Sequence, residues 1–324
     1  MNGVSRIHGR VSREMFQGMF PGYYPEELYI SHVTNGVHLP TWASVDWKDL
    51  YARYFGEDFL TNQPDRARWQ KIAEVPDEEI WTLRNKHRSK LIAYLRNRLG
   101  EDLKHRQENP KFIMKTLDKL DEHTLTIGFA RRFATYKRAH LLFANPERLA
   151  QLVNNTTHPV QFVFAGKAHP ADKAGQDLIK RIIEFSKQPQ FMGKVVFVEN
   201  YDMALGAQLV QGVDVWLNTP TRPLEASGTS GEKAVMNGVV NFSVLDGWWA
   251  EGYRPNAGWA LQEERMYENQ QFQDELDAEN IYNIFEEEII PAFYERNSKG
   301  IPEKWVSYIK NTIAGISPEF TMKR

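Results

Sequence analysis

The chain has 324 residues, of which 42% are hydrophobic and 25% charged, the balance of a globular protein. Its formal net charge of −2 excludes a global field that would steer it to nucleic acid or to an anionic membrane, so any anion site must be local. The absence of cysteine excludes a disulfide framework, cysteine-ligated metals and thiol catalysis, and we expect no metal site.

The first residues, 1–13, are polar and basic and lack the apolar core of a signal peptide. No apolar run is long enough to span a bilayer. We therefore expect a cytoplasmic protein without a nucleic-acid or membrane partner.

Residues 1–123 are predicted to be mainly helical, and their clearest helix covers 76–99. Pro76 and the acidic residues at 77–79 suit a first turn, apolar residues recur at helical spacing, and Gly100 is suited to end the helix. The basic residues of this helix are most simply its solvated face: Arg84, Lys86, Arg88, Lys90, Arg96 and Arg98.

From residue 124 the pattern changes to short apolar runs separated by helical patterns. The predicted strands are Leu125–Ala130, Val160–Ala165, Val195–Val198, Val213–Leu217 and Val239–Leu245. The predicted helices lie near 139–154, 171–187 and 202–211, and the chain becomes helical again after 250. Because strands that are apolar throughout alternate with helices, we predict that 124–324 form a doubly wound, Rossmann-like α/β domain. Ligands bind beyond the carboxyl ends of such strands, so the loops of interest are 131–138, 166–170, 199–202 and 218–233.

The first loop carries four cations, Arg131, Arg132, Lys137 and Arg138, just past a strand and at the predicted start of a helix. Helix amino termini favour anions, and guanidinium groups match phosphate oxygens. A solvated basic turn is the alternative, but the position at a strand end favours an anion site.

The second loop contains Gly166 and His169. A glycine at Gly166 permits close approach of a ligand to the backbone. A lone histidine is more often structural than catalytic, so we assign His169 no catalytic role.

The third loop, 225–238, is the most informative. Its Ser/Gly/Thr run is predicted to feed a short helix, where free backbone N–H groups can cradle a phosphate or sugar hydroxyls. Glu225 is able to accept hydrogen bonds from sugar hydroxyls. Lys233 lies one turn into the helix, where a desolvated lysine reacts with an aldehyde cofactor. Chemistry alone favours the alternative for Lys233, an exposed helix lysine.

Two of these motifs resemble those of the α-glucan phosphorylases, the family of glycogen, starch and maltodextrin phosphorylases. The run Glu-Ala-Ser-Gly-Thr from Glu225, followed at the family's spacing by Lys233, resembles its cofactor-binding signature. The run from Arg131 to Arg138 resembles its phosphate motif, usually Lys-Arg-x-x-x-Tyr-Lys-Arg.

Further segments match in order: 1–8, 34–37, 166–168 and 199–201. The likeness therefore covers nearly the whole chain. The tryptophan-rich segment 246–253 resembles the shorter, bacterial and archaeal branch of the family.

The resemblance implies a glycosyltransferase of the architecture with two Rossmann-like domains (GT-B). Inorganic phosphate would cleave the terminal α-1,4-linked glucose of a glucan and give α-glucose 1-phosphate with retained configuration. Pyridoxal 5'-phosphate would be the cofactor, with its phosphate as proton donor in place of the usual electron-sink chemistry of its ring.

Carried over by motif, the resemblance assigns Lys233 to pyridoxal phosphate. Arg131 and Thr229 would contact the cofactor phosphate, and Tyr201 would lie near its ring. Arg131 replaces the usual lysine, which keeps the charge but changes the geometry.

Arg132 and Lys137 would bind the substrate phosphate and hold it near the cofactor phosphate despite their repulsion. We expect these two residues and Lys233 to carry the catalytic chemistry. The glucosyl unit would be bound by Asn35, Glu225, Ser227 and Gly228.

Compared with the family, the chain lacks the glycine-rich loop that covers the phosphates and the histidine at the sugar 6-hydroxyl. We therefore expect residues 1–123 to hold the end of the amino-terminal domain and inter-domain helices. The carboxyl end at 320–324 would also stop short of a final helix. On this interpretation the missing amino-terminal half is a partner, turnover by the chain alone is poor, and a homo-oligomer is compatible with the sequence.

Two other functions compete with phosphorolysis. A nucleotide-sugar glycosyltransferase similar to glycogen synthase would carry a second glutamate eight positions after Glu225, where this chain has Lys233. A non-catalytic glucan-binding remnant would bind saccharide without cofactor or turnover. A dehydrogenase is weaker still, because no G-x-G-x-x-G follows the first sheet strand.

Overall fold

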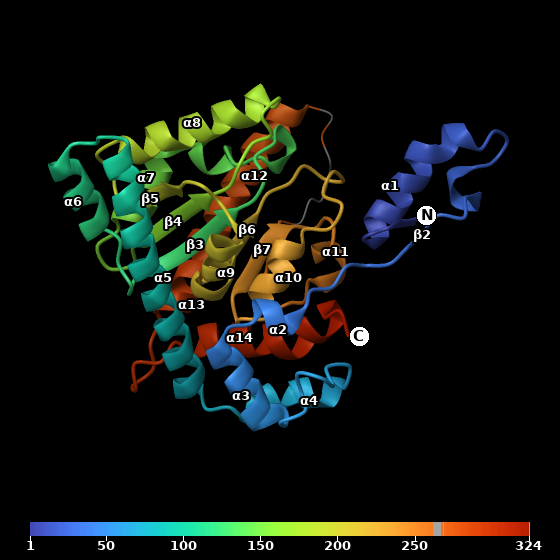
Figure 1. Ribbon diagram of the computed structural model, residues 1–324, viewed down its shortest axis with the longest axis horizontal. Helices are drawn as coiled ribbons and strands as arrows, with labels where there is room; N and C mark the ends of the chain where they lie inside the picture. Colours follow the sequence, from blue (N-terminus) through green and yellow to red (C-terminus); the bar gives the residue numbers. More distant parts are fainter. Residues whose placement is uncertain (262–266, 268, 324) are drawn as a thin grey trace.

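The computed structural model describes residues 1–261, 267 and 269–323, and its centre is a six-stranded parallel sheet (Figure 1). In sheet order the strands are β5 (Val195–Val198), β4 (Val160–Ala165), β3 (Leu125–Ala130), β6 (Val215–Asn218), β7 (Val240–Val244) and β8 (Trp259–Leu261). Numbered from β3, this order is 3-2-1-4-5-6, which is the order of the doubly wound Rossmann fold. The predicted fold class is confirmed.

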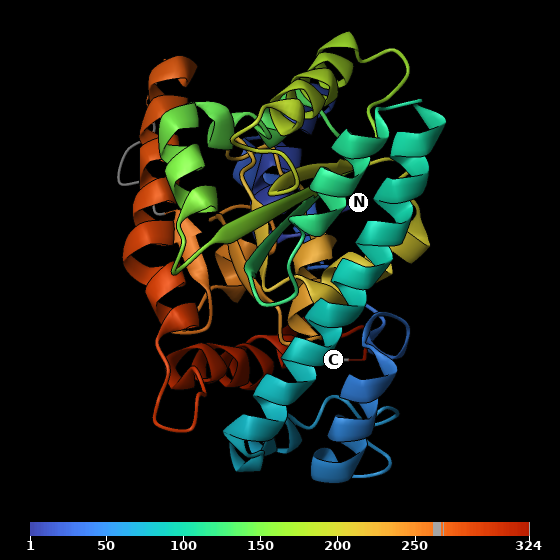
Figure 2. The same ribbon diagram turned by 90° about the vertical axis from the view of Figure 1, so that its left-hand side faces the viewer.

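Alternate residues of each strand enter two different cores. In β4, Phe162 and Phe164 belong to one apolar cluster, whereas Val163 and Ala165 belong to the other, as the two-residue period of a strand requires. Helices α5 (Asp77–His105) and α9 (Met203–Gly212) contribute to the second cluster. Helices α7 (Pro146–Asn154), α8 (Lys173–Lys187) and α12 (Gln270–Ile284) contribute to the first. Figure 2 shows α5 and α12 on opposite sides of the sheet.

The remaining elements connect or flank these layers. Before the sheet lie β1 (Asn2–Gly3), α1 (Arg6–Phe16), η1 (Gln17–Met19), η2 (Pro25–Glu27), β2 (Ser31–His32), α2 (Leu39–Trp42), α3 (Val45–Phe55), α4 (Arg66–Gln70), η3 (Lys71–Glu74) and α6 (Pro110–Asp118). Within and after it lie η4 (Thr135–Lys137), η5 (Leu141–Phe143), α10 (Thr229–Val235), α11 (Trp249–Gly252), the π-helix η6 (Phe285–Ile289), α13 (Ile290–Tyr294), α14 (Glu303–Gly315) and η7 (Ser317–Phe320).

Helix α5 corrects two expectations. Gly100 does not end it: the helix continues to His105, and Gly100 is buried where a Cβ atom would lie 3.3 Å from Leu117. The basic residues are not all a solvated face, because Arg84 and Arg88 are fully buried. Arg84 donates to the backbone carbonyls of 211, 213 and 237, so this cation ties the helix to α9 and to the segments before β6 and β7.

Element boundaries were predicted well for the first three strands and less well elsewhere. β3, β4 and β5 match the predicted ranges. The segment 139–154 is helical only in η5 and α7, because Asn145 caps α7 by accepting from the Arg148 N–H. Strand β8 was missed, since its three residues are too short for a strand pattern.

A small unit of α1, β1 and β2 stands apart from the sheet in Figure 1. The strap that follows it, residues 33–38, is fixed to the carboxyl-terminal segment: the Val37 N–H donates to Phe320 O at 2.8 Å, and the Met322 N–H donates to Val37 O at 3.1 Å. Among the described residues, no helix is both long and apolar enough for a membrane crossing.

Candidate active site at the sheet switch point

The candidate site is centred where the strand order reverses, between β3 and β6. Arg131 follows β3 directly, and Glu225 lies in the loop after β6. Arg131 Nη2 and Lys137 Nζ each lie 2.5 Å from Glu225 Oε2, and all three side chains are buried. The carboxyl edge at a switch point is the expected ligand position in such sheets.

Electrostatics hold this group in its charged form. Burial raises the pKa of Glu225, but the charges of Arg131 and Lys137 outweigh it and keep the pKa below its ordinary value. The Nε and Nη1 atoms of Arg131 are buried without a hydrogen-bond partner among the described residues. Arg131 therefore has donors left for an acceptor that the chain itself does not provide.

The other two cations of the loop behave differently. Arg132 is exposed, whereas Arg138 is buried and serves the fold. Its guanidinium donates to Thr219 O at 2.9 Å and to Pro220 O at 3.0 Å, and it pairs with Asp277 at 2.5 Å. The predicted cluster of four cations is thus wrong for Arg138. No α-helix follows β3 directly either: the loop contains the single 3₁₀ turn η4, so a helix terminus does not favour anions here.

The backbone of the first loop is hydrogen-bonded to the end of β4 and to the second loop. The Arg131 N–H donates to Ala165 O at 3.1 Å and the Phe133 N–H to Lys167 O at 2.9 Å. A Cβ atom at Gly166 would overlap the carbonyl oxygen of Arg131. The glycine therefore allows the backbone of the first loop to come close, where the sequence predicted the close approach of a ligand. His169 is exposed, and its Nδ1 accepts from the Ala171 N–H.

Asp246 shapes the loop that carries Glu225. Its carboxylate accepts from the Glu225 N–H at 2.9 Å and from the Gly247 N–H at 2.8 Å. Burial raises the pKa of Asp246 to about 6. Asp246 was not predicted as a site residue, although an Asp-Gly pair directly after a predicted strand is a signal in the sequence.

Ser227 and Gly228 lead into α10 as predicted. The Trp248 N–H donates to Ser227 O at 2.8 Å, which fixes the backbone, while the buried Ser227 Oγ has no partner among the described residues. Gly228 adopts a left-handed conformation with φ of 88° directly before Thr229 begins the helix, and glycine takes this conformation most readily.

Lys233 lies half-buried in α10. Its Nζ atom lies 3.7 Å from the centre of the Trp42 ring. Burial lowers the pKa of Lys233, opposed by the charge of Glu232. The Asn237 side chain donates at 3.0 Å to the carbonyls of both Trp42 and Lys233, which fixes the two segments together. Trp42 was missed because only folding brings α2 to α10.

The predicted site residues Tyr201 and Asn35 lie in segments other than the two loops that carry Arg131 and Glu225. Tyr201 is half-buried, and burial raises its pKa. A Cβ atom at Gly206 would lie 2.9 Å from its hydroxyl. Asn35 lies in the strap, where its N–H donates to Val4 O at 3.0 Å. Within the described part of the chain, the hydrogen bonds and ion pairs around Glu225 do not reach Arg132, Tyr201 or Asn35.

A model of the carbohydrate phosphorylase family matches residues 1–252. A glycogen phosphorylase of Aquifex aeolicus is 45% identical over 324 residues, and a maltodextrin phosphorylase of Thermococcus litoralis is 41% identical over 325. A glycogen phosphorylase of Mycobacterium tuberculosis is 39% identical over 323 residues. Each alignment covers 100% of this chain but only 46%, 38% and 37% of the respective relative.

Proposed function

Since the chain belongs to the carbohydrate phosphorylase family, we propose that it is the cofactor-holding and phosphate-holding part of an α-glucan phosphorylase. The whole enzyme would transfer the terminal α-1,4-linked glucose of glycogen or maltodextrin to inorganic phosphate, with retention, to give α-glucose 1-phosphate. The observation that carries this proposal is the buried group of Arg131, Lys137 and Glu225 at the sheet switch point, with unused donors on Arg131.

The residues present fit pyridoxal phosphate. Lys233 offers a half-buried amine of lowered pKa, which favours the neutral, nucleophilic form. Arg131 and Thr229 would hold the cofactor phosphate, using the guanidinium donors that lack a partner in the described chain, and Tyr201 would flank the ring. When bound, the cofactor would supply a phosphate group as proton donor.

The chain's own residues would then bind and orient the substrates. Arg132 is exposed and free to bind an incoming phosphate. Lys137 would pair with that phosphate as well as with Glu225. Two phosphates held close together repel, and fixed cations in a partly buried site offset that repulsion. Glu225, Ser227, Gly228 and Asn35 would bind the glucosyl hydroxyls, for which Glu225 in its ionised form is an acceptor.

The organisation of the chain follows from the same proposal. Residues 1–123 would contain the end of the amino-terminal domain and the inter-domain helices, and 124–324 the Rossmann-like catalytic domain. The partners would be an α-1,4-glucan, inorganic phosphate and the amino-terminal part that the relatives possess.

Phosphate-dependent release of glucose 1-phosphate tests the function. The assay would use maltopentaose and inorganic phosphate with the chain extended at its amino end to the length of the Aquifex relative, beside the chain alone. We expect release by the extended protein and its loss in Lys233→Ala. Tight binding of a nucleotide sugar without phosphorolysis would favour the glycosyltransferase alternative, and saccharide binding without turnover would favour a non-catalytic remnant.

A further inference from the structure

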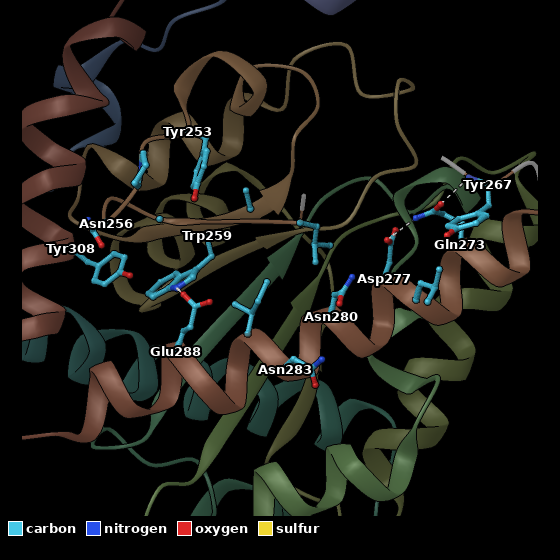
Figure 3. Close-up of a pocket in the computed structure, with 16 residues that line it drawn as sticks. Tyr253, Asn256, Trp259, Tyr267, Gln273, Asp277, Asn280, Asn283, Glu288 and Tyr308 are labelled. Carbon is cyan, nitrogen blue, oxygen red and sulfur yellow. Dashed lines mark hydrogen bonds between the residues drawn. The ribbon is translucent and has the colours of Figure 1, made fainter. Parts of the chain in front are cut away.

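A hollow lies beside β8 and has no part in the proposed active site. It has a volume of about 830 Å³ and is walled by the segment from Tyr253 to Leu261, by α12 and η6, and by Tyr308 of α14 (Figure 3). None of the residues proposed above for cofactor or substrate lines it. We call it the β8 pocket, and its size lies within the range of about 300–1,000 Å³ found for small-molecule sites.

The lining of the β8 pocket combines aromatic rings with uncharged hydrogen-bonding groups. Tyr253, Trp259 and Tyr308 supply the rings, and Asn256 and Asn280 supply carboxamides. The described lining residues include the acids Asp277 and Glu288 but no lysine, arginine or histidine. Because Asp277 is ion-paired with Arg138 at 2.5 Å, Glu288 is the acid that an anionic ligand would meet. A phosphate or carboxylate would find no cation among the described lining residues to pair with. Aromatic faces with amide and carboxylate acceptors suit a neutral ligand rich in hydroxyl groups.

The rings are held in fixed positions. Trp259 and Tyr308 stack with ring centres 4.5 Å apart and planes 19° apart. The Trp259 indole N–H donates to Glu288 Oε2 at 3.0 Å. Figure 3 shows the Tyr253 ring extending into the pocket from the side opposite Glu288. The orientations of Trp259 and Tyr308 are thus set by contacts within the chain.

Two backbone features coincide at this pocket. Glu288 lies in the π-helix η6, which interrupts the helical run between α12 and α13. Such π-turns are rare and occur frequently at functional sites. Asn256 has a left-handed φ of 61°, an uncommon conformation for a residue other than glycine. Both irregularities lie at residues of the lining.

We propose that the β8 pocket binds a neutral saccharide, with Glu288, Asn256 and Asn280 receiving and donating hydrogen bonds to its hydroxyls and Tyr253 packing against a sugar ring. The Tyr308 hydroxyl is a further donor: burial, the charge of Glu288 and the proximity of Tyr253 all raise its pKa, so it stays protonated at neutral pH. This site is independent of phosphorolysis and of the group around Glu225.

The test uses maltopentaose as probe and isothermal titration as readout. The chain carrying Glu225→Gln, which impairs the proposed active site, is titrated alone and in combination with Asn280→Ala or Glu288→Ala. We expect saccharide binding in the Glu225→Gln background, and affinity about two- to tenfold weaker in each double variant, because each loses a hydrogen-bonding group. Glucose 1-phosphate should not compete, since its charge meets Glu288 and finds no cation among the described lining residues.

Glu287→Ala is the matched control, because Glu287 is an exposed neighbour of Glu288 in the same π-helix but does not line the pocket. It should leave the affinity unchanged. Asn280 is exposed, so its variant should keep the melting temperature and remain informative even if Glu288→Ala loses stability. The proposal is overturned if the folded Glu225→Gln chain does not bind maltopentaose, or if Asn280→Ala binds as tightly as its parent.

Discussion

Lys233 and Trp42 meet across the boundary between the first helices and the sheet domain: the lysine Nζ lies 3.7 Å from the centre of the indole ring. The ring covers one side of the amine and contributes to its burial. Cation–π attraction favours the charged amine by about 0.5–1 kcal/mol at exposed sites, whereas burial disfavours it. Burial lowers the pKa of Lys233 and outweighs the charge of Glu232.

We predict that Trp42→Ala raises the pH at which Lys233 reacts with pyridoxal phosphate. Removing the ring exposes the amine, which raises its pKa and leaves less neutral amine at a given pH. The measurement is the pH midpoint of covalent capture under reducing conditions. Trp42→Phe keeps an aromatic face and should stay near the parent midpoint, and a lower midpoint in Trp42→Ala would show that the cation–π contact dominates.

Glu225→Gln should destabilise the fold in a pH-dependent way. The neighbouring cations lower the pKa of Glu225 despite burial, so its ionisation stabilises the folded chain above the ordinary value of 4.5, and that contribution is lost as the pH falls through the folded pKa. We expect the free energy of unfolding to fall by about 1–3 kcal/mol at neutral pH, with the gap to the parent narrowing in acid. Urea unfolding across pH measures it, and a constant gap would contradict the assignment.

Asp246→Asn should show the opposite pH trend. Burial raises the pKa of Asp246 from 3.8 to about 6, so its favourable contribution exists below the ordinary value and is lost as the pH rises through about 6. The side chain of the variant does not titrate, so this pH-dependent contribution is absent from it. The free energy of unfolding of the variant, relative to that of the parent, should therefore rise by about 1–3 kcal/mol between acid and neutral pH. A constant cost, from one backbone N–H that loses its acceptor, is added at every pH. The same unfolding series detects this, and a falling relative stability would refute it.

Arg84→Met should be strongly destabilising. The fully buried guanidinium donates to the carbonyls of 211, 213 and 237 and lies 3.8 Å from Asp214. Its loss leaves those acceptors unpaired, and we expect the free energy of unfolding to fall by about 3–5 kcal/mol. Lys86→Ala, on the exposed side of the same helix, removes only a surface pair with Asp46 and should cost less than about 1 kcal/mol. Equal effects in the two variants would contradict the buried role of Arg84.

The sheet was predictable from sequence because its strands are apolar throughout. The candidate ligand edge is a prediction from the rule that ligands bind beyond the carboxyl ends of parallel strands. β3, β4 and β5 have the predicted bounds. The same reasoning placed Arg131 and Glu225 on loops of one edge, although their direct ion pair was not foreseen.

What the sequence did not disclose depends on contacts between distant segments. Arg84 and Arg138 occur in basic runs that resemble solvated surfaces, yet acceptors from other elements bury both of them. Trp42 reaches Lys233 only when α2 packs beside α10. The π-helix that presents Glu288 has no periodic signature that distinguishes it from the helices on either side.

Borohydride reduction of the purified chain after incubation with pyridoxal phosphate, followed by peptide mapping, tests the central claim most directly. Lys167, which is exposed in the neighbouring loop, serves as the internal reference for nonspecific modification. The proposed site predicts a pyridoxyl adduct on Lys233 at a cofactor concentration that leaves Lys167 unmodified, and loss of that adduct in Lys233→Arg. An adduct spread equally over surface lysines, or no adduct on Lys233 in either the chain or its amino-terminally extended form, would contradict the cofactor site.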